Sequence, residues 1–98
     1  MTYKDLIETI QIVAKYNGGL DKECCEMWVA YEEHGIRIKN AKKVSAVDLR
    51  RLAEMGWHLG CDAEYNEEDS EKWENCESLS DEEIVELFSE YGGIYKYE

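Results

Sequence analysis

The residues of this sequence that could do chemistry and that cluster most densely are its aspartates and glutamates. Residues 61–78 contain eight of them against one base, Lys72, and also hold Tyr65 and Trp73. Carboxylates so closely spaced could bind a divalent cation, act as general acids and bases, or attract a basic partner. Their spacing distinguishes these uses.

The spacing does not match a calcium loop. Asp62, Glu64 and Asn66 occupy the first, third and fifth positions of a possible EF-hand loop. Glu67 then stands where the loop needs glycine, and Trp73 stands where it needs a bidentate glutamate. We therefore expect no calcium site here.

Zinc and catalytic motifs are also lacking. His58 and Cys61 have zinc-like spacing, but a structural zinc site needs two such pairs. The sequence has no glycine-rich phosphate loop, nucleophile elbow or H-E-x-x-H motif. We predict a protein that has no metal or cofactor and is not an enzyme, with its four cysteines as thiols.

The whole net charge of −12 lies in one third of the chain. Residues 62–91 carry 13 acids and one base, whereas the other 68 residues carry 10 of each. A basic segment, residues 36–51, has six bases against one acid, Asp48. This excess of acidic over basic residues argues against direct nucleic-acid binding. No stretch of the sequence is typical of a membrane span or a signal peptide. We expect a cytoplasmic protein.

Three capping pairs predict where helices begin: Thr2 with Asp5, Ser45 with Asp48, and Ser80 with Glu83. Apolar residues at helical spacing follow each pair and predict the buried faces: Leu6, Ile7, Ile10, Val13 and Ala14, then Val47, Leu49 or Leu52, and Ala53, then Ile84, Val85, Leu87, Phe88 and Tyr91. Glycines follow each of the three segments and end the helices.

Strands are predicted between the helices, at residues 24–31, 36–38, 57–59 and 94–97, with a turn at 32–35. The acidic stretch before the last helix is expected to be a loop with a short helical turn near residues 71–74. The order α-β-β-α-β-α-β indicates a single α+β domain over residues 1–98. It would have three helices and a small, mostly antiparallel sheet of three to four strands.

The large aromatic residues divide into two groups. Trp28, Trp57 and Phe88 lie in apolar patterns and are expected in the core. Trp73 lies among charged residues, which leaves two interpretations open. It either folds back over the core beneath the acidic stretch, or it is an exposed contact for a partner.

The location of the excess charge predicts a binding surface. Glu82, Glu86 and Glu90 are four residues apart, so they share one helix face at intervals of about 6 Å. A solvated face that serves solubility is the simpler alternative, but solubility does not require such concentration. The residues expected to contact a partner are Glu64, Glu67, Glu68, Asp69, Glu71, Trp73, Glu74, Glu82, Glu86 and Glu90.

A dense negative surface complements a basic groove of the kind that holds DNA or RNA by its phosphates. Fixed carboxylates could occupy such a groove in place of phosphates, and electrostatic steering would speed the encounter. We therefore expect the partner to be a basic nucleic-acid-binding protein, bound by nucleic-acid mimicry.

Much of the N-terminal 60 residues resembles small acidic proteins encoded by bacteriophages and prophages. The resemblance rests on AKYNGG (residues 14–19), CCEMWV (residues 24–29) and a pattern made by Val44, Ser45, Asp48, Leu52, Gly56 and Trp57. Some short acidic phage proteins are anti-CRISPR or other anti-defence inhibitors. The resemblance thus implies a bacterial host cell and a CRISPR effector as an example of the partner, and it carries over no binding residue.

Two other classes fit the same charge pattern. An immunity protein or antitoxin would use its acids to block the basic site of a toxin. A structural homo-oligomer, for example a homodimer, would pair the basic segment 36–51 of one copy with the acidic segment 62–91 of another. Such an assembly would dissociate in salt.

Replacement of Glu82, Glu86 and Glu90 by glutamine tests whether these side chains are exposed. Like charges at this spacing destabilise a helix by about 0.2–0.5 kcal/mol per pair. The triple variant should therefore be as stable as the parent or slightly more stable, while its partner binding weakens. Thermal unfolding followed by circular dichroism measures the stability, and loss of folding would contradict the exposed-face assignment.

Overall fold

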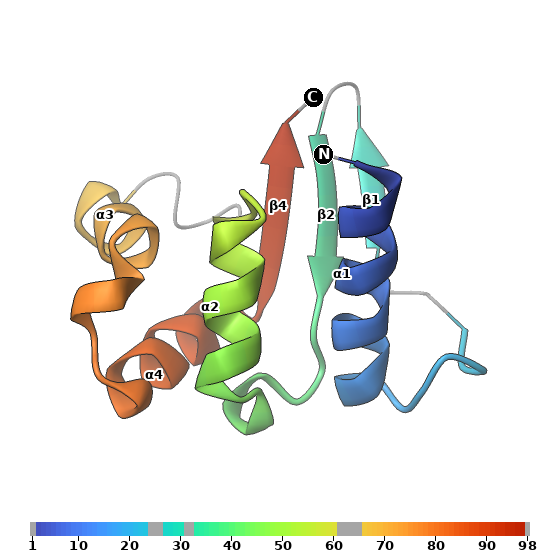
Figure 1. The fold of residues 1–98 in the computed structure, drawn as a ribbon, viewed down its shortest axis with the longest axis horizontal. Helices are drawn as coiled ribbons and strands as arrows, with labels where there is room; N and C mark the ends of the chain where they lie inside the picture. Colours follow the sequence, from blue (N-terminus) through green and yellow to red (C-terminus); the bar gives the residue numbers. More distant parts are fainter. Residues whose placement is uncertain (1, 24–26, 31–32, 61–65, 98) are drawn as a thin grey trace.

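Four α-helices and a four-stranded antiparallel sheet make up the described part of the chain. The structure, a computed structural model, describes residues 2–23, 27–30, 33–60 and 66–97. The elements are α1 (Tyr3–Tyr16), β1 (Met27–Ala30), β2 (Glu33–Arg37), α2 (Ala46–Glu54), β3 (His58–Leu59), α3 (Glu67–Glu74), α4 (Asp81–Tyr91) and β4 (Gly93–Tyr97). The strands pair in the order β1-β2-β4-β3. In Figure 1, α1 lies at the β1 end, α3 and α4 lie at the opposite end, and α2 lies between them.

The three predicted helix starts are confirmed. Thr2, Ser45 and Ser80 each accept a hydrogen bond from a backbone N–H group three residues further on. Ser80 and Glu83 also form a reciprocal capping box. The α+β class follows from these helices and the sheet, and none of the described helices is long and apolar enough to cross a membrane.

A further helix, α3, lies where we predicted mostly loop, so the prediction of three helices is wrong. Asn66 caps α3 by accepting a hydrogen bond from the Asp69 N–H group at 3.2 Å. Trp73 is the one buried residue of its eight. The segment therefore lacks the repeated apolar positions by which a helix is recognised in a sequence. Glu64 lies outside the described residues.

β2 begins earlier than predicted. It starts at Glu33, so residues 33–35 form a strand and not a turn. β2 pairs with β1 on one side and with β4 on the other, and the β4 pairing runs from Glu33 to Arg37. Backbone pairing on both sides outweighs the local turn preference of Gly35. The other predicted strands are confirmed as β1, β3 and β4 within the described ranges.

The core lies between the sheet and the helices, and all four described α-helices contribute buried side chains to it. Its fully buried side chains include Leu49, Leu52, Ile84, Phe88 and Ile94. Trp57 is also buried, as predicted, whereas the side chain of Trp28 is outside the described part. Val47 was expected in this core but is 75% exposed in the first turn of α2, so that prediction is wrong.

Helix α1 turns a different face to the core than predicted. Ile7 and Ile10 are 57% and 40% exposed, while Thr9, Ile12 and Val13 are buried. The reason is a polar contact at the centre of the face. The Thr9 hydroxyl lies against the Trp57 ring nitrogen inside the core, and its burial fixes the rotation of the helix.

The Thr9 hydroxyl should contribute measurably to stability. It accepts a hydrogen bond from Trp57 Nε1 at 2.9 Å and donates one to the Asp5 carbonyl oxygen at 2.8 Å. Thr9→Val leaves the buried indole N–H unpaired, which should lower the free energy of unfolding by about 1–3 kcal/mol. Urea denaturation measures the loss, with Thr9→Ser as the control because it keeps the hydroxyl. Equal losses in the two variants would show that the hydrogen bond contributes nothing.

Candidate partner-binding surface

The side chain of Trp73 packs α3 against the core of the molecule. Its side chain is 1% exposed, and its Nε1 donates a hydrogen bond to the Trp57 carbonyl oxygen at 2.8 Å. Its ring centroid lies 6.1 Å from that of Phe88 on α4. The interpretation of Trp73 as an exposed partner contact is therefore wrong, because so large an aromatic surface gains more by covering the core.

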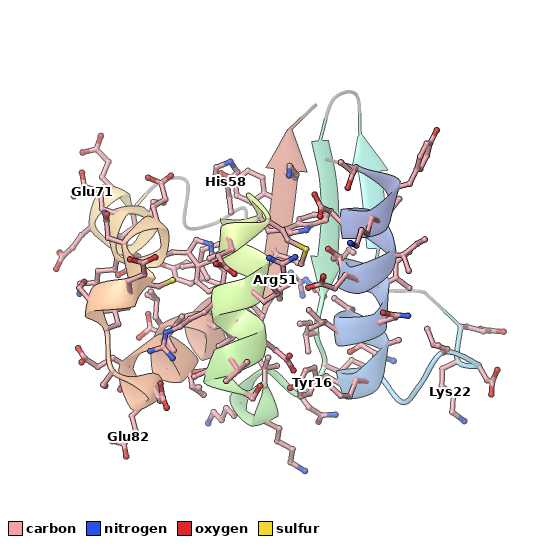
Figure 2. The ribbon with its side chains drawn as sticks, in the orientation of Figure 1. Tyr16, Lys22, Arg51, His58, Glu71 and Glu82 are labelled. Carbon is pink, nitrogen blue, oxygen red and sulfur yellow. The ribbon has the colours of Figure 1, made fainter. Side chains whose placement is uncertain are left out.

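Burial of Trp73 directs the carboxylates of α3 outward. Glu67, Glu68, Glu71 and Glu74 are exposed, and Asp69 is half-buried. Figure 2 shows Glu71 directed away from the body of the molecule at the α3 end, and Glu82 directed outward from α4. Every predicted contact residue within the described part, except Trp73 and Asp69, has an exposed side chain.

A first groove lies between α3 and the strands β3 and β4. Glu67, Glu71 and Glu74 follow one another at spacings of four and three on α3, and all three line this groove of about 270 Å³. His58 and Tyr95 form its other wall, with ring centroids 5.2 Å apart. His58 Nδ1 lies 3.9 Å from Glu74 Oε1, so the two groups attract when the imidazole is protonated. The groove combines carboxylates with aromatic surface.

A second groove, of about 240 Å³, separates α3 from α4 and brings together acids distant in the sequence. Asp69 from α3 lines it with Glu86 and Glu90 from α4, and Lys72 is the base among them. The Tyr91 hydroxyl donates a hydrogen bond to Asp69 Oδ2, which joins the end of α4 to α3. This hydrogen bond, followed by desolvation, raises the pKa of Tyr91 to about 12.

A third groove, of about 520 Å³, runs between α4 and the start of α2. Glu82 and Glu86 line it together with Val85 and Lys42. Asp81 also lines this groove, and its Oδ1 accepts a hydrogen bond at 2.5 Å from Arg50, which donates a second one to the Leu79 carbonyl oxygen at 2.9 Å. Glu86 is shared between this groove and the previous one, so the two grooves run along neighbouring flanks of α4.

The surface retains most of its negative charge. Residues 66–91 contain 11 acids and one base. That base, Lys72, pairs with Glu68 at 3.3 Å, and Arg50 pairs with Asp81. Few internal cations therefore compete with a partner for these carboxylates.

Two residues of this surface were missed in the sequence. Tyr91 was predicted as an apolar residue of the last helix, and its contact with Asp69 spans 22 positions with no local signal. His58 was weighed only as a zinc ligand. In the described part, no group of three His, Cys, Asp or Glu side chains is arranged to hold a metal ion. Cys76 is a free, buried thiol whose pKa is raised by that burial.

Comparisons with known proteins do not assign this chain to a family. No family model matches it, and searches of curated proteins and of solved structures returned no significant match.

The Tyr91–Asp69 hydrogen bond should be visible in a titration. The folded-state pKa of about 12 lies above the value of about 10 for a free tyrosine. Because the folded pKa is raised, the stability from this bond is complete below about pH 10 and is lost as the pH rises through about 12. Tyrosinate absorbance of the parent minus that of Tyr91→Phe should change near pH 12. A difference that titrates near pH 10 would contradict the bond.

Proposed function

We propose that this chain inhibits a nucleic-acid-handling protein by occupying its basic site in place of nucleic acid, as an anti-CRISPR or other anti-defence protein would. The observation that carries the proposal is the gathering of exposed carboxylates from α3 and α4 at one end of the molecule. The proposed contacts are Glu67, Glu68, Asp69, Glu71, Glu74, Glu82, Glu86 and Glu90.

Fixed positions favour tight binding through these carboxylates. They lie on two helices that Trp73 and the Tyr91–Asp69 bond hold against each other and against the core. A surface ordered before binding loses less conformational entropy than a flexible acidic tail would. A folded domain is therefore better suited to block a phosphate-binding groove than the same charge on an unstructured chain.

The groove between α3 and the strands suits an incoming arginine or lysine side chain. Three glutamates on one wall would pair with the charged group, while the exposed ring of His58 on the other wall, backed by the buried Tyr95, offers surface to the aliphatic stem. Charge brings the partner to this end of the molecule, and such grooves select partners whose basic residues fit them.

The same surface would serve an immunity protein or antitoxin, with a toxin as the target. The homo-oligomer formed by segment 36–51 and the acidic segment has less support. Two of the six bases of segment 36–51 already bind within the chain, because Arg50 pairs with Asp81 and Arg51 pairs with Glu8. Those pairs would have to break before the bases could reach a second copy.

Recovery of a partner from nuclease-treated bacterial lysate tests the proposal. The tagged parent should retain a nucleic-acid-binding protein at low salt and release it at high salt, since salt screens exposed charges. The Glu82→Gln, Glu86→Gln, Glu90→Gln variant should bind roughly 3- to 150-fold more weakly, from about 0.2–1 kcal/mol for each of three exposed ion pairs. Titration of the purified partner gives the two affinities.

The matched control carries the same change of charge at the other end of the molecule. It replaces Asp5 and Asp21 by asparagine and Glu23 by glutamine, and it should bind like the parent. Equal weakening of both variants would mean that total charge matters and the proposed surface does not. Recovery of a toxin would establish the immunity interpretation in place of this one.

A further inference from the structure

Exposed apolar side chains gather at the end of the molecule opposite the acidic surface. The described part exposes five large hydrophobic residues, and three of them lie on α1. Tyr3, Ile7 and Ile10 are 88%, 57% and 40% exposed, and Leu20 follows the helix in the next loop. The fifth, Val47, stands apart on α2. Such a cluster on a highly charged chain needs a physical explanation.

The three side chains form one stripe along a flank of α1. Tyr3, Ile7 and Ile10 are separated by four and three residues, which places them above one another on the helix surface. The flank toward α2 is marked by Glu8, which binds Arg51 of that helix. Successive residues of an α-helix are rotated by about 100° around its axis. The stripe therefore lies on the opposite side of α1 from Glu8 and faces away from α2.

Within the described residues, β1 pairs with a strand on one edge only, and it lies at the same end of the molecule. β1 is the terminal strand of the sheet and pairs with β2 on one side. Figure 1 places α1 and β1 together at this end, with α3 and α4 at the other. A terminal strand offers a row of backbone N–H and C=O groups that readily pair with a further strand.

We propose that this end binds a second copy of the chain. The two β1 strands pair antiparallel across a two-fold axis, which joins the sheets, and the Tyr3–Ile7–Ile10 stripe of one α1 packs against that of the other. Such a contact is self-complementary, so both β1 edges are used within the dimer, and β3 is the terminal strand at each end of the joined sheet. It covers both the apolar stripe and the strand edge in one step.

The charge distribution allows two copies to meet at this end and opposes a contact between their acidic ends. Each copy carries −12, but the residues outside segment 62–91 are balanced. Joining the copies through their α1 ends points the two acidic surfaces away from each other. Each chain is 34 Å long, which exceeds the screening length of about 8–10 Å at physiological salt, so repulsion between the acidic surfaces is small.

The size of this end of the molecule limits the contact to a small interface. The cross-section at this end is 29 by 22 Å at most, or on the order of 600 Å² in projection. A standard interface buries about 800 Å² of accessible surface per partner, so a contact confined to this end belongs with the smaller, more weakly held interfaces. The dimer is independent of the proposed inhibition and would present two acidic surfaces, one at each end.

Light scattering coupled to size-exclusion chromatography tests the dimer. The parent at micromolar concentration should have twice the chain mass of 11.5 kDa, and the mass should persist at high salt because the contact is apolar and backbone-based. Ile7→Lys with Ile10→Lys should raise the dimer dissociation constant at least tenfold and give the single-chain mass, with an unchanged circular dichroism spectrum. Ile7→Ser with Ile10→Ser is the milder form of the same change.

Val47→Lys is the control, since it places one lysine at an exposed apolar position away from α1, and it should leave the dimer intact. Three results would overturn the proposal. They are a parent with the single-chain mass at every concentration, stripe variants that remain dimeric, and a dimer that dissociates in salt, which would instead indicate pairing of basic and acidic segments.

Discussion

Burial of Trp73 is the interaction on which the acidic end of this molecule depends. α3 has eight residues, fewer than the roughly 12–15 that an isolated helix needs to persist in water. Its sequence offers no second fully buried side chain to hold it. The indole packs near Phe88 of α4 and donates a hydrogen bond to the Trp57 carbonyl oxygen, so one side chain joins α3 to both α4 and the strand region.

The packing of Trp73 also determines the direction in which the carboxylates of α3 face. Once Trp73 faces inward, the four glutamates of α3 face solvent, and the Asn66 cap and the Glu68–Lys72 pair complete the helix. Tyr91 then joins α4 to α3 through Asp69. The repulsion among so many carboxylates is opposed by a few contacts beneath them, and the result is a preformed negative surface in place of a flexible acidic loop.

Local signals in the sequence predict three of the four described helix starts, at Thr2, Ser45 and Ser80, because a cap involves residues three positions apart; the Asn66 cap of α3 has the same spacing but is not followed by apolar residues at helical spacing. The location of the negative charge could likewise be read directly. The features that could not be predicted depend on contacts between residues that are distant in the sequence. The rotation of α1 follows from Thr9 meeting Trp57, the extension of β2 follows from pairing with β4, and α3 follows from Trp73 reaching the core. The contact of Tyr91 with Asp69 could not be predicted for the same reason, because the two residues are 22 positions apart.

The most direct test of the central claim is competition between this chain and nucleic acid for the partner recovered from lysate. A fluorescent oligonucleotide bound to that partner should be displaced by the parent protein and retained when the Glu82, Glu86 and Glu90 triple glutamine variant is added at the same concentration. Displacement should weaken as salt rises, since both ligands are held by charge. Formation of a ternary complex that holds the oligonucleotide and this chain together would contradict mimicry.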